Sequence, residues 1–331
     1  MPQSCLITGA TGFVGGHLAE TCVERRLDVR TIARPNSDTK ALDKLGVKIH
    51  RGDLTDPAVV REAVQDVDLI IHCAAKVGDW GPVEKYRAVN VVGLRNLLDA
   101  CKGTMLQRFV HLSSLGVYAA RNHYGADENE ALPDQHIDGY TQSKVESERL
   151  ALRYYREFEV PVVVLRPGFI YGPRDRTLLP KVIENLRQGK LRYLGGGKSA
   201  LNTIYVGNLV EAILLALNHP DAIGKIFNLT DGEVVTKRRF LDAIADGLSL
   251  PKPPNSPVPV WLARFLASVM EKRARNKGSK EAPMLTQARV KFLGLNLDFS
   301  IDKAKRELGY KPSTTFDEGI RRTMAWYREN G

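Results

Sequence analysis

Short apolar runs alternate with amphipathic stretches through the first half of the chain. Six runs predict β-strands, at residues 4–7, 28–33, 48–51, 69–73, 108–112 and 162–166. Stretches with helical spacing separate most of them, at residues 59–64, 85–101 and 140–158. This alternation predicts an α/β fold, a Rossmann-type doubly wound parallel sheet with helices on both faces. In such sheets ligands bind at the carboxyl ends of the strands.

A glycine-rich turn follows the first predicted strand. Gly9, Gly12 and Gly15 recur every third residue and lead directly into residues 17–23, which have helical composition. Glycine lets the backbone turn tightly and approach a pyrophosphate, while the helix that follows directs free N–H groups and its positive dipole end at the anion. The turn predicts a dinucleotide site. The alternative is a turn that only packs the helix closely against the sheet.

After Pro167 the pattern is less regular. Runs at 202–206 and 225–229 predict strands, with a helix at 210–218 between them, and we interpret all three as additions to the core sheet. A proline-rich linker over 251–259 precedes a mostly helical end. We therefore expect a dinucleotide-binding core from 1–168 plus about 201–230. A smaller, interleaved C-terminal substrate domain would comprise about 169–200 plus 231–331.

Composition narrows the class of function. The chain has 331 residues, a formal net charge of +10 and four cysteines that show neither disulfide nor metal spacing. Neither a signal peptide nor an apolar run approaching the ~20 residues of a membrane span is visible. We expect a cytoplasmic protein without a metal, whose positive charge suits anionic partners such as nucleotide phosphates. No nucleic-acid motif accompanies the basic stretch at 264–280, so we expect no nucleic-acid partner.

Three side chains could carry chemistry. Tyr140 and Lys144 are four residues apart, which places them on one helix face. The ammonium, together with a cationic nicotinamide ring, is expected to lower the tyrosine pKa and let the phenol exchange a proton with a substrate oxygen. Ser114, just beyond the strand at 108–112, could hydrogen-bond the same oxygen. The alternatives are an exposed helix pair and a turn-capping serine, while His111 is interpreted as a core histidine.

These motifs resemble the extended short-chain dehydrogenase/reductase superfamily, also called the NAD-dependent epimerase/dehydratase superfamily. The resemblance rests on the segments 8–15, 52–54, 72–75, 90–96, 113–118, 140–144 and 165–173. It implies that Ser114, Tyr140 and Lys144 are catalytic, which disfavours a cofactor-binding protein without turnover. It also implies cofactor contacts from Gly9, Thr11, Gly12, Phe13, Val14, Gly15, Arg34, Asp53, Leu54, Ala74, Ala75, Lys76, Asn90, Tyr140, Lys144 and Pro167.

Within the superfamily the chain is most similar to the 3β-hydroxysteroid dehydrogenase branch. That branch includes sterol-4α-carboxylate 3-dehydrogenases and 2-alkyl-3-oxoalkanoate reductases, and the similarity rests on segments 75–81, 172–180 and 299–312. It implies an NAD(P)-dependent oxidoreductase that interconverts a secondary alcohol and a ketone on a hydrophobic substrate. Nucleotide-sugar epimerases and dehydratases share the core motifs and are the alternative.

Different residues indicate which cofactor and which class of substrate the protein binds. Arg34 closes the second strand where an acidic residue would favour NAD, so NADP(H) is favoured, although an Arg34 stacked on adenine would leave NAD(H) usable. Basic side chains for a nucleotide sugar and apolar side chains for a lipid-like substrate are both present. The basic set is Arg166, Arg174, Arg176 and Lys198, and the apolar set is Trp80, Phe169, Tyr171, Leu178 and Leu179.

A helix predicted over 258–270 is amphipathic. Trp261, Phe265 and Val269 recur every four residues, and a basic segment follows them. We expect this apolar face either to pack on the core or, with residues up to 275, to lie at a membrane interface. The sequence also leaves a homodimer open.

Overall fold

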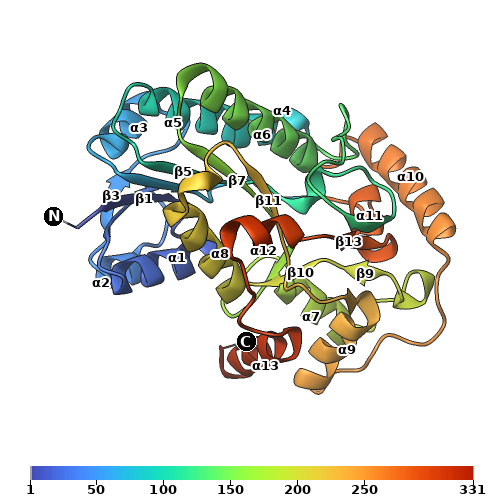
Figure 1. Ribbon diagram of the computed structural model, residues 1–331. Helices are drawn as coiled ribbons and strands as arrows, with labels where there is room; N and C mark the ends of the chain where they lie inside the picture. Colours follow the sequence, from blue (N-terminus) through green and yellow to red (C-terminus); the bar gives the residue numbers. More distant parts are fainter. Residues whose placement is uncertain (1, 331) are drawn as a thin grey trace.

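The computed structural model describes residues 2–330 and is built on a seven-stranded parallel sheet (Figure 1). In spatial order its strands are β11 (Ile226–Leu229), β7 (Val162–Pro167), β5 (Arg108–Leu112), β4 (Leu69–His72), β1 (Ser4–Thr8), β2 (Asp28–Ala33) and β3 (Lys48–Arg51). Three of the six predicted N-terminal strands match to the residue, and the other three differ by one residue at one end. The predicted doubly wound parallel sheet is confirmed.

The strand register brings the carboxyl ends of the central strands to one edge. Thr8 pairs with His72, and His72 pairs with His111 on the next strand. The order of strands reverses between β1 and β4, which is the topological switch point where such sheets bind ligands. The residues that follow β1, β4 and β5 therefore lie side by side at this point.

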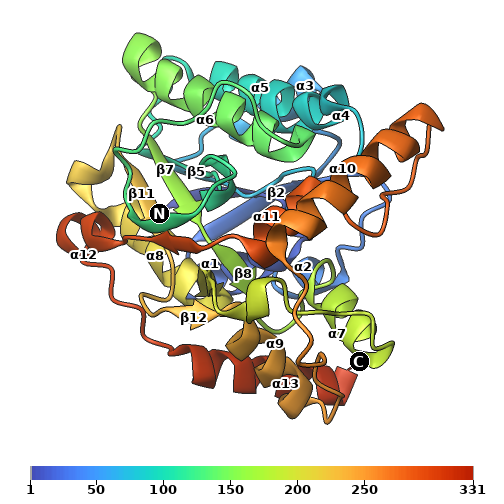
Figure 2. The same cartoon turned by 90° about the vertical axis from the view of Figure 1, so that its right-hand side faces the viewer.

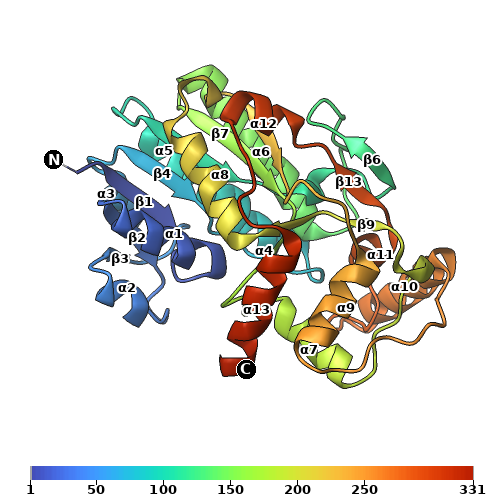
Figure 3. The same ribbon diagram turned by 60° about the horizontal axis from the view of Figure 1, so that its bottom comes forward.

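Helices cover both faces of the sheet. The α3 (Pro57–Val64), α5 (Leu94–Cys101) and α6 (Gly139–Phe158) helices share one apolar core with one face, whereas α1 (Phe13–Glu24), α8 (Val206–Asn218) and α12 (Asp302–Leu308) share a second core with the other face (Figure 3). The helix predicted over 85–101 is continuous but not uniform. It consists of α4 (Val83–Arg87), a π-helical segment (Ala88–Gly93) and α5. Such π-helical turns are frequent at functional sites.

The rest of the chain forms a smaller C-terminal part with three two-stranded sheets. The remaining elements are α2 (Lys40–Lys44), β6 (His123–Ala126), β8 (Phe169–Tyr171), α7 (Leu179–Arg187), β9 (Ala200–Leu201), β10 (Thr203–Tyr205), β12 (Val235–Thr236), α9 (Lys237–Gly247), α10 (Val260–Asn276), α11 (Gln287–Gly294), β13 (Leu297–Phe299) and α13 (Phe316–Asn330). Within residues 2–330, no helix has the length and apolar content needed to cross a membrane.

One predicted strand pairing is wrong. The strand at 202–206 is observed as β10, but it pairs with β8 in a separate small sheet and does not join the core sheet. Gly168, between β7 and β8, explains the geometry, because a Cβ there would lie 2.0 Å from the Asn202 carbonyl oxygen. The missing side chain lets the two segments approach and form their own pair.

The residues that helix α10 buries are not those that its apolar pattern predicts. Its buried residues are the small Ala263 and Ala267, which pack with Val290 of α11. Trp261 and Phe265 are 71% and 62% exposed. Figure 2 shows α10 alongside α11. The core-packing alternative is therefore wrong for these two aromatic residues, because the small side chains let α10 approach α11 closely and leave the large ones outside.

Candidate active site

The glycine turn places backbone where side chains cannot fit. Gly9 has a φ of +78°, and a Cβ on it would lie 2.9 Å from the Ala74 backbone. A Cβ on Gly15 would lie 2.2 Å from the Gly9 carbonyl oxygen, so the first turn of α1 packs directly on the loop. Gly12 precedes α1 and provides no side-chain cap. The result is a turn whose form requires glycine at Gly9 and Gly15.

This turn fits the pyrophosphate of a dinucleotide. In the described part of the chain no side-chain hydrogen bond caps the N-terminus of α1, and its first turn holds no acidic residue. Thr11 and Gly12 are exposed, while Phe13 and Val14 are partly exposed. A bound anion would meet free backbone N–H groups and the positive end of the helix dipole.

The other predicted cofactor residues lie at the same edge of the sheet. Arg34 follows β2 and is exposed, and its guanidinium makes no hydrogen bond or ion pair within residues 2–330. Leu54 is buried and Asp53 is partly exposed just beyond β3. Ala74 and Ala75 follow β4, and Pro167 ends β7.

Asn90 is part of the π-helical segment and fixes the loop after β4. Its Oδ1 accepts from the Lys76 N–H at 2.7 Å, and its Nδ2 donates to the Lys76 carbonyl oxygen at 3.0 Å and to the Ser143 hydroxyl at 2.8 Å. Both amide hydrogens are thus used inside the protein. In this geometry Asn90 fixes the position of Lys76 and ties the loop to α6.

Tyr140, Lys144 and Ser114 are brought together by α6 and the end of β5. Asp138 caps α6 by accepting from the Thr141 N–H at 2.8 Å. The Lys144 ammonium donates to the Leu112 carbonyl oxygen at 2.6 Å, directly before Ser113 and Ser114. The Ser114 hydroxyl accepts from the Gly116 N–H at 3.0 Å and lies close enough to the Tyr140 phenol to act on its pKa. The three predicted catalytic residues therefore form one cluster.

Burial sets the protonation of this cluster. Burial, followed by the charge of Asp138, raises the pKa of Tyr140 to about 12, whereas the Ser114 hydroxyl acts in the lowering direction. Burial also lowers the pKa of Lys144 to about 8. The lowering of the tyrosine pKa expected from Lys144 together with a nicotinamide ring is not seen in the protein alone, because desolvation of the phenol dominates and the charge acting on it is the carboxylate of Asp138. These pKa shifts arise from the groups of the protein and include no contribution from a cationic nicotinamide.

Two histidines underlie the cluster without joining it. The rings of His72 and His111 are stacked with centroids 5.5 Å apart. Burial and the Lys144 charge lower the pKa of His72 to about 3 and that of His111 well below its usual value. Both are therefore neutral core residues at pH 7, as expected for His111.

A buried network of hydrogen bonds and an ion pair lies behind Ser113 and Ser114 and was not predicted from the sequence. Glu148 of α6 accepts from the Ser113 hydroxyl at 2.7 Å and forms an ion pair with Arg166 of β7. Arg166 also donates to the Tyr118 hydroxyl at 2.8 Å. Glu148 lies four residues after Lys144, and that spacing on the same helix face was the available signal.

A second missed residue joins the C-terminal part to the catalytic loop. Lys291 of α11 donates to the carbonyl oxygens of Gly116 and Tyr118, both at 2.8 Å. The residue is 8% exposed. Nothing in the sequence distinguishes it from an ordinary surface lysine.

Neither the basic nor the apolar set of candidate substrate residues forms a single binding site. Arg166 is bound to Glu148, and Arg174 pairs with Glu20 of α1, so two of the four basic residues are used inside the protein. In the apolar set, Tyr171 and Leu179 are fully buried in the core of the C-terminal part. Arg176, Leu178 and Lys198 remain exposed.

Comparisons with known proteins agree with this geometry. The model of the NAD dependent epimerase/dehydratase family matches residues 5–230. The chain is 31% identical to the 2-alkyl-3-oxoalkanoate reductase of Shewanella oneidensis over 96% of this chain and 85% of that protein. It is 34% identical to the 3 beta-hydroxysteroid dehydrogenase/Delta 5-->4-isomerase of Mycobacterium tuberculosis, covering 97% of this chain and 90% of that protein.

Solved structures extend the comparison. The crystal structure of gox2253 matches with a TM-score of 0.84 and 30% identity, covering 99% of both chains. A UDP-glucuronic acid 4-epimerase from Bacillus cereus, in complex with UDP-glucuronic acid and NAD, matches with a TM-score of 0.77 and 22% identity, covering 99% of this chain and all of that one. At that identity the epimerase likeness shows the fold alone.

Proposed function

The chain belongs to the NAD dependent epimerase/dehydratase family, and we propose that it is an NAD(P)-dependent oxidoreductase that interconverts a ketone and a secondary alcohol on a hydrophobic substrate. The observation that carries this proposal is the cluster of Ser114, Tyr140 and Lys144 beside the glycine turn. A nicotinamide cofactor, when bound, supplies or accepts the hydride.

The residues of the chain would handle the proton. In the direction of reduction, the Ser114 hydroxyl would donate a hydrogen bond to the ketone oxygen, and Tyr140 would transfer its proton to that oxygen. A phenol with a pKa near 12 is fully protonated at pH 7, as the donor must be. Lys144 would hold the ribose hydroxyls, and its positive charge would stabilise the phenolate that remains.

A hydrophobic substrate is favoured over a nucleotide sugar. Relatives at 31% and 34% identity are named for 3-oxoalkanoate and hydroxysteroid substrates. A nucleotide diphosphate needs several free cationic groups, and the ion pairs of Arg166 and Arg174 remove two of the four available. We therefore propose a substrate of the 3β-hydroxysteroid, sterol or 2-alkyl-3-oxoacid type.

We further propose that the cofactor is NADP(H). The matched family is described as NAD dependent, and the finer preference rests on Arg34. This exposed guanidinium follows β2, where the 2′-phosphate of NADP would lie, and a guanidinium can hold a phosphate with two parallel hydrogen bonds.

The proposed division of labour follows the fold. Residues 1–168 and about 201–230 would bind the dinucleotide, because they provide the seven-stranded sheet and the glycine turn. Residues of about 169–200 and 231–331 would bind the substrate across the same sheet edge.

The experiment is a turnover assay with three substrate classes. Purified protein is mixed with NADPH or NADH and with a 2-alkyl-3-oxoacid or a 3-oxosteroid, and oxidation of the cofactor is followed. A nucleotide sugar is incubated separately with the oxidised cofactor and its products are separated by chromatography, because epimerisation or dehydration returns the hydride and leaves the cofactor unchanged. We expect turnover with one of the first two classes, and expect Tyr140→Phe to lower kcat by about 10²–10⁴-fold while cofactor affinity is kept. Turnover of the nucleotide sugar alone, or near-normal kcat in Tyr140→Phe, would contradict the proposal.

A further inference from the structure

Helix α10 presents large apolar side chains to the solvent. Trp261, Phe265 and Leu266 lie within six residues and are 71%, 62% and 42% exposed. The opposite side of the helix packs on α11 through Ala263 and Ala267. Single exposed apolar residues are ordinary, but a cluster that includes tryptophan marks an interaction surface.

The same face of α10 becomes basic toward its C-terminus. At about 100° per residue, Trp261, Phe265, Lys272 and Arg275 all project within an arc of about 80°. All four are exposed in the structure. The face therefore has an aromatic half followed by a cationic half.

The surrounding charge is strongly positive. Residues 260–281 contain six lysines and arginines but only two acidic residues, Glu271 and Glu281. Glu271 is mostly buried, and it accepts from the Gln287 N–H at 2.7 Å and lies 3.9 Å from Arg275. The excess positive charge of this surface thus calls for an anionic partner.

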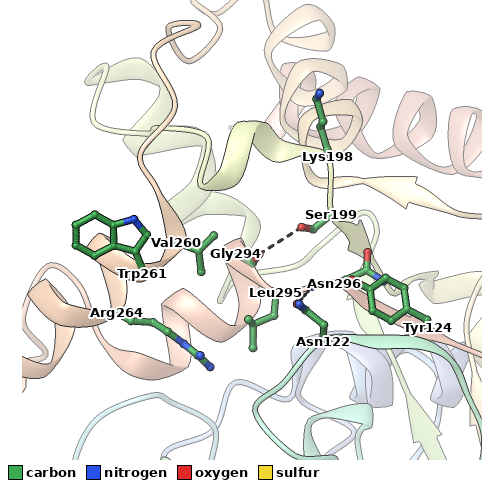
Figure 4. A pocket seen from close by; sticks show the side chains of 10 residues that line it. All are labelled: Asn122, Tyr124, Lys198, Ser199, Val260, Trp261, Arg264, Gly294, Leu295 and Asn296. Atoms are coloured by element: carbon green, nitrogen blue, oxygen red, sulfur yellow. Dashed lines mark hydrogen bonds between the residues drawn. The ribbon is translucent and has the colours of Figure 1, made fainter.

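A groove of about 500 Å³ borders this face (Figure 4). Trp261 and Arg264 of α10 line one side, and Lys198 lines the side toward β9. Tyr124 and the amides of Asn122 and Asn296 complete the polar part of the wall. The Asn296 amide is bonded to Ala200 and His123, and Arg264 donates one N–H to the Ala120 carbonyl oxygen at 2.9 Å. The remaining guanidinium N–H groups of Arg264, beside the Trp261 ring, suit a phosphate-bearing headgroup with an apolar body.

We propose that α10 docks this protein on the surface of an anionic lipid bilayer. Trp261 and Phe265 would enter the interface, Lys272 and Arg275 would meet the headgroups, and the groove would receive one headgroup phosphate. Arg275 lies over the Trp80 ring at 5.2 Å, and Trp80 donates to the Ser279 carbonyl oxygen, so the docked helix contacts the loop that follows β4. The proposal does not depend on which substrate the enzyme takes.

A second copy of the chain fits this surface less well than a membrane does. A two-fold contact through α10 brings identical faces together. Either the basic halves would meet each other, or each aromatic half would meet the basic half of its partner. The first arrangement is repulsive, and the second leaves Lys272 and Arg275 without an acidic partner on this face.

The test is co-sedimentation with phosphatidylcholine vesicles prepared with and without phosphatidylserine. The wild type is compared with Trp261→Ser/Phe265→Ser, with Lys272→Gln/Arg275→Gln and with the control Met105→Ser, which removes an exposed apolar side chain elsewhere. We expect the wild type and the control to bind vesicles containing phosphatidylserine, and binding to weaken as salt rises. Each double variant should bind about tenfold more weakly.

Melting curves and light scattering on the same proteins complete the test. Both aromatic side chains are exposed, so Trp261→Ser/Phe265→Ser should melt within about 2 °C of the wild type. Equal vesicle binding by the wild type and this variant would overturn the proposal. So would wild-type binding that ignores phosphatidylserine, no vesicle binding at all, or a wild-type dimer that the variant dissociates.

Discussion

Burial gives Lys144 and Tyr140 their chemistry. Lys144 is 5% exposed, and the hydrogen bond recorded for its ammonium goes to a neutral carbonyl oxygen. Desolvation therefore lowers its pKa to about 8, while it raises that of Tyr140 to about 12. At pH 7 both groups hold their protons, which is the state that carbonyl reduction requires.

The lowered pKa of Lys144 predicts a pH-dependent cofactor affinity. The ammonium binds ribose only while protonated, and its protonated fraction falls as the pH rises through about 8. We expect KM for the cofactor to rise about tenfold between pH 7 and pH 9. Lys144→Arg keeps its charge over this range, so it should show a higher but flat KM. A flat wild-type profile would contradict the assignment.

Arg34 should set the choice of cofactor. Arg34→Asp removes a phosphate contact and adds repulsion, so the NADP(H)/NAD(H) ratio of kcat/KM should fall by about 10²-fold. Arg61→Asp on α3 makes the same change in net charge on an exposed site and should leave the ratio unchanged. A wild type that already strongly prefers NAD(H) would remove Arg34 from the proposed site.

At the scale of elements, the junction of β1 and α1 offers a matched pair of glycines. A Cβ on Gly15 would lie 2.2 Å from the Gly9 carbonyl oxygen, whereas one on Gly16 would lie 3.5 Å from the nearest atom, the Ala10 carbonyl oxygen. We expect Gly15→Ala to displace the turn, cost about 1–3 kcal/mol of stability and raise the cofactor Kd at least tenfold. Gly16→Ala should keep affinity and gain up to about 1 kcal/mol. Titration of cofactor fluorescence and urea unfolding would measure both, and equal effects would refute this packing.

The sequence predicted the elements whose signal is local. Strands such as β4 and β5 are mostly apolar runs buried in the sheet, and the glycine turn encodes its own backbone geometry. The sequence could not predict which strands pair with each other. The pairing of β10 with β8 depends on Gly168 and on a contact between distant segments. The face that α10 buries could not be predicted for a similar reason. Its aromatic spacing fits a buried face, but Ala263 and Ala267 allow the closer contact with α11.

Across the whole molecule, buried lysines connect the parts of the chain. Lys291 links α11 to the loop after Ser114, and Lys237 of α9 donates to the carbonyl oxygens of Ala200 and Leu295. Among residues 2–330 neither ammonium is paired with a carboxylate, and burial lowers the pKa of Lys237 to about 7 and that of Lys291 to about 8. Only the tertiary structure creates this environment, so no sequence pattern could have indicated it.

These lysines predict that the protein becomes more stable as the pH rises from 7 to 8.5. In the unfolded chain a lysine keeps its proton to about pH 10.4, whereas Lys144, Lys237 and Lys291 lose theirs near pH 7 to 8 in the folded state. The unfolded state then binds more protons, so the free energy of unfolding increases with pH, on the order of 1 kcal/mol per lysine.

The trend should reverse at higher pH and should respond to a single substitution. Burial raises the pKa of Cys73 and Cys101 to about 12, so once the unfolded lysines also lose their protons, above about pH 10.4, the folded state holds more protons than the unfolded state and stability falls. Urea unfolding at pH 7.0, 7.75 and 8.5 measures the rise in the wild type. Lys237→Met removes one of the three contributions, so its unfolding free energy should rise less steeply, while the exposed Lys190→Met should follow the wild type. If the urea midpoint of the wild type fell between pH 7.0 and 8.5, the prediction would be wrong. The carbonyl partners would then stabilise the charged ammonium groups more than burial destabilises them.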